Sequence, residues 1–549
     1  HMTGSANMPD GDTMVARARR VLGGRKTSVM LALGFAAGFP NVMLIGTLNA
    51  WLSAAGVDLA TIGVLSWIGL AYAFKFLWSP AVNLSPPLGF GRLGRRRGWM
   101  LICQIVITAC IAVIALSDPA HGLGLMAAAA TLAAFASATQ DISIDTWRIE
   151  AADTSAPLDL LSAVYQFGYR TSSLAGGAGA LFLADQMAWS DVYLIAALVM
   201  ALAATATLFA PEPARDLAAE EKSHAVDART TPQQRLIALG LVLSAWAVSI
   251  YFIVDFMILA VTSDKPPAAA QFTREMGPWI VAATVIFPCA LAAWLSRLSP
   301  KAKAQPGHRS VDRLYGAIVT PFVEIMSRLG FAAILVVFLI LTYRITDSIW
   351  GPFAFPFYLQ ELQYTNSEVA FASKLFGVIM TIAGVGLGAI CLVVLGRMAS
   401  LTLGAAIAAA SNLLFADLAY GGPGIDAVLT ATGLDGVFAW FGADLRMARL
   451  MLAITGENIA AGFAGAAFVA YLSSLASRLH GAVQFAVFTS LTLLVGTLGR
   501  GWIGEEIKEI GYGPVFEITA MIGIVAVIAC IFEWMRTPRA GIRQAGQSA

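Results

Sequence analysis

Charged side chains inside long apolar runs are the residues of this sequence best placed to do chemistry. A charge near the centre of a lipid bilayer costs about 2.5–3.5 kcal/mol even on the lenient insertion scale, so each such residue needs a partner or a function. The residues concerned are Lys75, Asp141, Asp145, Arg170, Asp255, Arg344, Asp347, Lys374, Glu457 and Arg500.

Two carboxylates recur at helical spacing in the segment Gln140-Asp141-Ile-Ser-Ile-Asp145-Thr-Trp147. The i, i+4 interval places Asp141 and Asp145 on one face of a helix. Two like charges this close disfavour simultaneous ionisation, which suits a group that carries a proton. The alternative is a cytoplasmic gate, in which the two carboxylates pair with loop arginines such as Arg148.

Of the five cations inside apolar runs, Lys75, Arg170 and Lys374 lie at different depths and are candidates for substrate binding. Arg170 is about 12 residues into its span, roughly 18 Å deep, so it needs a carboxylate from the protein or from a substrate. Lys75 and Lys374 are shallower. For these two lysines, the alternative to substrate binding is that the ammonium group reaches back to the membrane surface.

Two further acidic residues, Asp347 and Glu457, are expected deep in the second half of the chain. Each is a candidate for proton coupling. The alternative role is to hold helices together, since polar contacts between membrane helices are worth about 0.6 kcal/mol on average. We expect Asp255 and Arg500, which lie near the outer ends of their spans, to be structural.

The composition defines the class of protein that must position these charges. Of 549 residues, 58% are hydrophobic and 13% are charged, whereas soluble chains are nearer half apolar and a quarter charged. The mean hydropathy is +0.73. Lys and Arg number 35 against 34 Asp and Glu, so no basic excess exists to bind nucleic acid. The sequence predicts an all-α polytopic membrane protein.

The cysteines and histidines exclude two other kinds of site. All five cysteines lie in apolar runs without a CxxC pair, and all five histidines fall in predicted tails or loops. We therefore expect neither a disulfide framework nor a metal site.

Hydropathy divides the chain into fourteen predicted transmembrane helices in a pattern of six, two and six. The predicted parts are a cytoplasmic tail (1–28), a six-helix half (29–210), a linker (211–234), two additional helices (235–298), a linker with an amphipathic helix (299–330), a second six-helix half (331–535) and a cytoplasmic tail (536–549).

The distribution of Lys and Arg predicts the orientation. Most of them fall in tails and in alternate loops, including a candidate gating loop with Arg95, Arg96 and Arg97. Since cytoplasmic loops are enriched in these residues, both termini are predicted to be cytoplasmic.

Interruptions by glycine and proline recur at matching places in the two halves. Gly34 to Pro40 opens the first span, and Gly351 to Pro356 lies in the first span of the second half. Paired interruptions of this kind are typical of a transporter's central site, although both residues are generally common in membrane helices.

The run Gly384-Val-Gly-Leu-Gly388 predicts close helix packing. Segment 420–444 is predicted to be an outer loop.

Several segments together resemble AmpG-type muropeptide permeases of the major facilitator superfamily. In the first half these segments are Leu33-Gly-Phe-Ala-Ala-Gly38-Phe-Pro40, Gly46-Thr-Leu-Asn-Ala-Trp51, Tyr72-Ala-Phe-Lys-Phe-Leu-Trp-Ser-Pro80, Gly94-Arg-Arg-Arg-Gly-Trp99, Ser137-Ala-Thr-Gln-Asp141-Ile-Ser-Ile-Asp145-Thr-Trp147 and Phe167-Gly-Tyr-Arg170. In the second half they are Asp347, Ser373-Lys374-Leu-Phe-Gly377, Glu457-Asn458 and Gln484-Phe-Ala.

The resemblance implies a monomeric transporter in the bacterial inner membrane. It would import anhydro-muropeptides into the cytoplasm for cell-wall recycling, driven by the proton gradient and without a cofactor. The proton-coupling residues expected on this basis are Asp141, Asp145, Asp347 and Glu457. The substrate-binding residues expected are Lys75, Arg170 and Lys374 for carboxylates, Asn458 and Gln484 for acetamides, and Tyr72 and Tyr169 for sugar faces.

The sequence also departs from the family pattern. Asn83 stands where the inner-loop motif of the superfamily usually has Asp, which leaves the gate contact of that residue open. Related carriers transport acetyl-CoA, so another large anion is the alternative substrate. An intramembrane prenyltransferase would need two carboxylate clusters to hold Mg²⁺ and a diphosphate, and only the Asp141/Asp145 pair is present. A receptor without transport activity is the remaining alternative.

Overall fold

A computed structural model describes residues 23–57, 68–87, 89–214, 229–262, 269–298, 307–346 and 353–537. Every regular element in these ranges is a helix. Asp347 lies outside the described residues, as do most of both predicted tails.

The first part of the chain forms a bundle whose spans are partly broken into shorter helices. Its elements are α2 (Arg25–Asn41), η1 (Val42–Thr47), α3 (Leu48–Ala54), α5 (Gly69–Ala73), η3 (Lys75–Leu77), α6 (Ser79–Leu84), η4 (Gly91–Leu93), α7 (Arg95–Ala115), α8 (Leu123–Ala151), α9 (Leu158–Ser173), η5 (Leu174–Gly179), α10 (Ala180–Ala184) and α11 (Trp189–Phe209).

The middle of the chain forms two long apolar helical segments, the second of which contains a π-helical turn, and two shorter helices. They are α13 (Pro232–Thr262), α14 (Ala269–Val281) with η6 (Ala282–Ile286) and α15 (Phe287–Ser296), then α16 (Arg309–Ile318) and α17 (Thr320–Leu329). The last part contains α18 (Ala332–Tyr343), α20 (Ala354–Pro356), η8 (Phe357–Glu361), α21 (Asn366–Val369), η9 (Ala370–Phe376), α22 (Gly377–Val394), α23 (Arg397–Ala419), α24 (Pro423–Thr432), α25 (Leu434–Trp440), α26 (Leu445–Leu475), α27 (Gly481–Ile510) and α28 (Tyr512–Arg536).

Ten helices in the described residues are long and apolar enough to cross a membrane, and α17 with α18, bent by 106°, would make an eleventh. The class predicted from the sequence, an all-helical polytopic membrane protein, is therefore confirmed. The number of fourteen spans stays a prediction.

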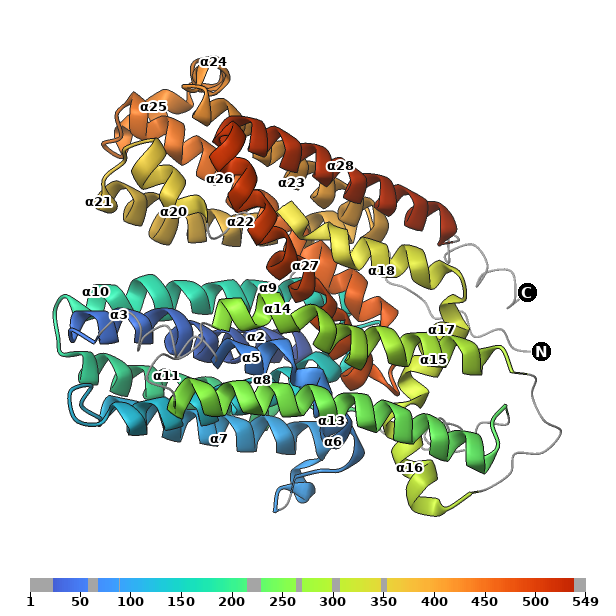
Figure 1. Ribbon diagram of the computed structural model, residues 1–549. Coiled ribbons are helices and arrows are strands. Elements are labelled where there is room, and N and C mark those ends of the chain that lie inside the picture. Colours follow the sequence, from blue (N-terminus) through green and yellow to red (C-terminus); the bar gives the residue numbers. More distant parts are fainter. Residues whose placement is uncertain are drawn as a thin grey trace, which may run out of the picture.

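Figure 1 shows how the parts are arranged. Helices α2 to α11 form one bundle, and α18 to α28 form a second. The bundles approach each other at the end where α27 crosses between them, and they diverge toward the end that carries α3, α10 and α21. The middle helices α13, α14 and α15 run along one side of this assembly.

Glycine allows the helices within each bundle to touch backbone to backbone. A Cβ atom on Gly34 would lie 2.4 Å from the Tyr165 carbonyl oxygen, so α2 and α9 can meet only with glycine there. In the second bundle, a Cβ on Gly384 would lie 2.2 Å from the Ile459 carbonyl oxygen, where α22 meets α26. The close helix packing predicted for the run beginning at Gly384 is thus confirmed.

The proline interruptions noted in the sequence coincide with changes of helix type. The π-helix η1 follows Pro40 after a single residue, and the π-helix η8 follows Pro356 directly. Short π-helical turns occur frequently at functional sites. The other residues of the second motif, up to Pro352, lie outside the described residues.

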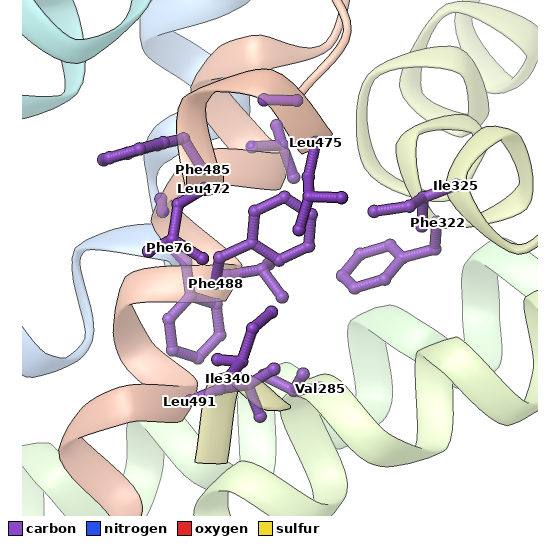
Figure 2. Packing of buried hydrophobic residues seen from close by; sticks show 14 of the residues in the cluster. Phe76, Val285, Phe322, Ile325, Ile340, Leu472, Leu475, Phe485, Phe488 and Leu491 are labelled. Carbon is purple, nitrogen blue, oxygen red and sulfur yellow. The ribbon is translucent and has the colours of Figure 1, made fainter. Parts of the chain in front are cut away.

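The largest hydrophobic core joins all parts of the chain. Figure 2 shows Phe76 of the first bundle, Val285 of the middle helices, Phe322 of α17 and Phe488 of α27 in one cluster. The ring of Phe76 also meets Trp246 of α13 edge to face, with centroids 6.2 Å apart. Because Phe76 follows Lys75 in the chain, α13 packs directly beside the turn that carries this charged residue.

Candidate functional site

Four charged side chains meet in the interior of the first bundle. Lys75 Nζ lies 3.7 Å from Asp141 Oδ2 and 3.5 Å from Asp145 Oδ2. Arg148 Nη1 lies 3.1 Å from Asp145 Oδ1. All four residues are buried, with Lys75 and Asp141 the most exposed at 7%. Two cations and two anions make the cluster formally neutral, which is the condition under which charges tolerate a low-dielectric interior. We call these four residues the charge cluster.

Local structure explains why these side chains converge. Lys75 is the first residue of η3, a single tight turn between α5 and α6. The Ser79 hydroxyl donates to the Phe76 carbonyl at 2.8 Å and stabilises this turn. On α8, Asp141 and Asp145 share one face as their spacing predicts, and Arg148 adds an i, i+3 partner for Asp145. The turn thus places Lys75 beside the face of α8 that carries Asp141 and Asp145.

The two carboxylates of the cluster have different surroundings. Asp145 has a cation near each oxygen, Lys75 on one side and Arg148 on the other. The Oδ1 atoms of both residues accept no hydrogen bond from the described residues, but that of Asp145 faces Arg148, whereas Asp141 has only Lys75, at the longer distance. A buried carboxylate oxygen without a partner is costly. Asp141 is therefore the less stabilised anion of the pair.

Arg148 connects the cluster to the second bundle. Its Nε and Nη2 donate to Ser473 Oγ of α26, at 3.3 and 3.1 Å. Its guanidinium carbon also lies 4.5 Å from the ring centroid of Tyr165 and 5.0 Å from that of Phe485. The sequence placed Arg148 only as an alternative partner for the acidic pair. Ser473 carries no sequence signal, because a serine in an apolar helix has no distinctive pattern.

Other polar contacts between the bundles gather at the same end of the molecule. Asn83 Nδ2 donates to the Leu479 carbonyl at 3.3 Å, and Arg478 donates to the Ala152 carbonyl. Arg397 of α23 pairs with Asp159 of α9 at 2.7 Å. Together with Arg148 and Ser473, these contacts close the bundles against each other at this end.

The three arginines predicted to form a gating loop, Arg95, Arg96 and Arg97, instead form the first turn of α7, which is tied to this closed end. Arg96 is almost fully buried, pairs with Glu150 at 2.7 Å, and donates to Asn83 Oδ1 at 2.7 Å. Asn83 therefore contacts Arg96 even though the superfamily motif usually has Asp at this position. As an amide, it accepts from Arg96 and donates across to Leu479 at once, which a carboxylate cannot do.

A second acidic residue, which sequence reasoning missed, contacts the first turn of α7. Glu212 accepts backbone hydrogen bonds from Arg96 and Arg97 at 2.9 and 3.1 Å, at the N-terminus of α7. Anions are favoured at this end of a helix. The acid lies far from α7 in sequence, so no local pattern could have identified it.

Three predicted substrate residues lie on α5 and α9 of the first bundle. Tyr72 of α5 and Tyr169 and Arg170 of α9 are half-buried. The Tyr169 ring lies 6.1 Å from the ring of Tyr165, which in turn contacts Arg148. Tyr169 and Tyr165 of α9 thus lead to Arg148 of the cluster on α8.

The predicted residues of the second half have varied surroundings. Glu457 is half-buried on α26. Asn458 accepts from the Thr381 hydroxyl at 2.9 Å and donates to the Ile454 carbonyl at 2.9 Å. Lys374 belongs to η9, but its side chain lies outside the described residues, as does that of Arg500.

Gln484 lies at a junction between α27 and α17. Its Nε2 donates to the Pro321 carbonyl at 2.9 Å and to Glu324 at 2.6 Å, and its Oε1 accepts from the Ser477 amide at 2.8 Å. A substrate acetamide at this residue would have to replace these bonds.

Of the charged residues expected to be structural, Asp255 is exposed.

Known proteins resemble this chain at the level of sequence. No protein-family model matches the chain. The anhydromuropeptide permease of Escherichia coli K12 is 39% identical over 201 residues, which are 36% of this chain and 40% of the permease. The match thus spans two fifths of that relative's length. A putative transporter, AmpG 4 of Rickettsia conorii, is 23% identical over 503 residues, 91% of this chain and 94% of that protein.

Solved structures resemble the chain at the level of fold. The proton:xylose symporter XylE gives a TM-score of 0.53 at 12% identity, covering 95% of this chain and 97% of that one. The POT family transporter PepTSo gives 0.53 at 15% identity, covering 92% and 97%. The human organic anion transporter MFSD10 gives 0.51 at 14% identity, covering 94% and 99%. These similarities show the fold of the major facilitator superfamily, and the sequence matches confirm the resemblance to AmpG-type permeases.

Proposed function

From the premise that this chain has the major facilitator fold and resembles anhydromuropeptide permeases, we propose that it is a proton-coupled secondary transporter. It imports anhydro-muropeptides into the bacterial cytoplasm by alternating access. The observation that carries this proposal is a buried, neutral charge cluster at the place where the two bundles touch.

In this proposal the closed end of the molecule is the cytoplasmic gate. Arg148, Asn83 and Arg478 each reach across from one bundle to the other there. Opening toward the cytoplasm has to break these contacts, so their strength sets how often the gate opens. The described structure then corresponds to the state that receives substrate from outside.

The same end holds basic residues that support a cytoplasmic orientation. Arg25 donates to the Phe209 carbonyl, Lys26 pairs with Asp153, and Arg97 donates to the Leu208 carbonyl. Lysine and arginine near membrane-helix ends favour the cytoplasmic side. We therefore propose that the ends of α2 and α28 next to the termini face the cytoplasm of a bacterium, across its inner membrane.

We assign proton uptake to Asp141. Its carboxylate is the less stabilised of the pair, so adding a proton there loses little attraction to Lys75 and removes the repulsion from Asp145. The cluster then carries one net positive charge, which makes the closed, dehydrated state less favourable. Loss of the proton to the cytoplasm restores neutrality and favours closure. Asp347 and Glu457 remain further candidates for the proton path.

The substrate side of the proposal rests on Arg170, Tyr72 and Tyr169. A muropeptide stem carries several carboxylates, and a planar guanidinium binds a carboxylate through two parallel hydrogen bonds. Tyrosine rings can stack on the apolar faces of sugars. Lys75 and Lys374 are proposed as further cations, and Asn458 and Gln484 as acetamide sites after their present bonds are exchanged.

Uptake into proteoliposomes tests the proposal. Labelled anhydro-muropeptide should accumulate when the outside is more acidic than the lumen, and unlabelled muropeptide should compete. Acetyl-CoA is the competing candidate, since carriers of another large anion share this fold. If acetyl-CoA accumulates and muropeptide does not, the substrate assignment is wrong while the transporter assignment stands.

A further inference from the structure

The predicted outer loop between α23 and α26 folds into two short helices, α24 and α25. They lead into the first residue of α26, Leu445, whereas Ser473 of the closed end lies 28 residues later on that helix. At 1.5 Å per residue, this separation is about 42 Å. The two helices therefore lie at the end of the molecule opposite the closed end, which is the outer end in the orientation proposed above. Figure 1 shows them at the edge of the second bundle that faces away from the first.

One side of this helical pair is firmly attached to the bundle. Ile425 and Leu429 of α24 are fully buried, and Phe438 of α25 is nearly so. Arg449 of α26 binds Asp426 through two bonds of 2.7 and 2.6 Å. The pair is thus held at a fixed position on α26.

The other side of α25 presents a ridge of large apolar side chains. Val437 and Trp440 lie at i and i+3 on α25, and Phe441 follows as the first residue after this helix, at i+4. Their side chains are 50%, 83% and 58% exposed. Leu445, four residues after Phe441, is also exposed and begins the membrane-crossing α26. We call these four residues the outer ridge.

No charge of this segment is directed against the outer ridge. Residues 420–444 contain no Lys, Arg or His. Asp426 is held by Arg449, Asp435 accepts from the Gly436 amide, and Asp444 accepts from the Met447 amide at the start of α26. Each carboxylate therefore has a partner within the chain, and the surface of the ridge stays apolar.

We propose that α24 and α25 form an anchor that inserts the outer ridge into the outer leaflet of the membrane. Tryptophan and phenylalanine on a short helix rich in apolar residues favour the boundary between headgroups and acyl chains. The ridge lies at the level where α26 enters the membrane and on the edge remote from the first bundle. A lipid surface therefore fits it better than a substrate moving between the bundles. The anchor is independent of the transported substrate.

A quenching experiment on the full chain in nanodiscs tests this proposal. Cys289 and Cys391, the two partly exposed cysteines among the five, are replaced by Ala. A single new cysteine is then introduced as Trp440→Cys, or as Asp435→Cys for the matched control on the same helix. Each carries an environment-sensitive fluorophore, which is exposed to lipid-borne quenchers at headgroup depth and to aqueous iodide.

The label at position 440 should be quenched by the lipid-borne group severalfold more than the label at 435, and by iodide severalfold less. Equal quenching of both labels by iodide, with no response to lipid, would overturn the anchor. If position 440 were shielded from both quenchers, and more so with more protein copies per nanodisc, a second copy of the chain would cover the ridge. This result would also reject the membrane anchor. Monodisperse elution of each variant ensures that folded protein is compared.

Discussion

Arg148 of α8 donates from Nε and Nη2 to the hydroxyl of Ser473 on α26, while its Nη1 lies 3.1 Å from Asp145. One guanidinium therefore holds a buried carboxylate of the first bundle and a helix of the second. Any motion that separates the bundles at this end has to exchange or break the Ser473 contact. This relationship is the physical basis for linking protonation of the cluster to the opening of the gate.

Removal of the Ser473 hydroxyl should loosen the gate. Ser473→Ala leaves Arg148 without its acceptor on α26, and a hydrogen bond to a charged group contributes about 1.5–3 kcal/mol. We expect a longer distance between spin labels at Thr154 and Leu395, which are exposed positions at the closed end of the two bundles.

Ser474→Ala is the matched control for this change, because the Ser474 hydroxyl donates to Tyr471 of its own helix. The control should leave the distance between the labels unchanged. Identical distance distributions for both serine variants would mean that the Arg148–Ser473 contact does not hold the gate.

The two carboxylates of the cluster should respond differently to neutralisation. Asp141→Asn should retain exchange of substrate across the membrane but lose accumulation driven by a pH gradient. Asp145→Asn removes the counter-charge of buried Arg148, and breaking a buried pair costs about 3–5 kcal/mol. It should therefore lower the thermal midpoint of the purified protein far more than Asp141→Asn does.

Exchange assays and thermal melts on both variants measure this difference. If Asp141→Asn accumulated substrate in response to a pH gradient as well as the wild-type protein does, another residue would have to bind the proton. A thermal midpoint that falls more for Asp141→Asn than for Asp145→Asn would contradict the structural role given to Asp145.

Restoring the residue usual for the superfamily at position 83 should weaken closure in this chain. Asn83 accepts from Arg96 and donates to the Leu479 carbonyl. In Asn83→Asp the pairing with Arg96 strengthens, but the donor to the second bundle is lost and an anion faces a carbonyl oxygen. The distance between labels at Thr154 and Leu395 should lengthen. A shorter or unchanged distance would show that the amide donor contributes nothing to closure.

Arg170 should discriminate between substrates with and without a peptide. Arg170→Lys keeps the positive charge but loses the planar fork that matches a carboxylate. Uptake of the peptide-bearing muropeptide should fall about tenfold, which corresponds to about 1.4 kcal/mol. Competition by the disaccharide without its peptide should change much less. Equal losses for both ligands would identify Arg170 as a structural ion-pair residue.

Sequence reasoning predicted the membrane class and the acidic face of α8, because hydropathy and helical spacing are local properties. It also predicted the packing at Gly384, since only glycine permits the backbone contact with α26. It could not predict that Arg148 meets Ser473, because these residues are 325 positions apart and a serine leaves no trace in a hydropathy pattern.

The contacts of Gln484, predicted as an acetamide site, could not be predicted from the sequence either. Gln484 of α27 binds Pro321 and Glu324 of α17, a helix that is bent by 106° from the α18 that follows it. The sequence predicted an amphipathic segment there, but not the helix it would cover. Whether Gln484 also binds substrate stays a prediction.

The central claim is that substrate and protons enter together, and the pH inside proteoliposomes tests it most directly. A pH-sensitive dye is trapped in vesicles at equal internal and external pH, and anhydro-muropeptide is then added outside. The wild-type protein should acidify the lumen as substrate enters. In vesicles preloaded with unlabelled substrate, Asp141→Asn should admit labelled substrate by exchange without acidification. Entry of labelled substrate through the wild-type protein with no change in internal pH would contradict proton coupling.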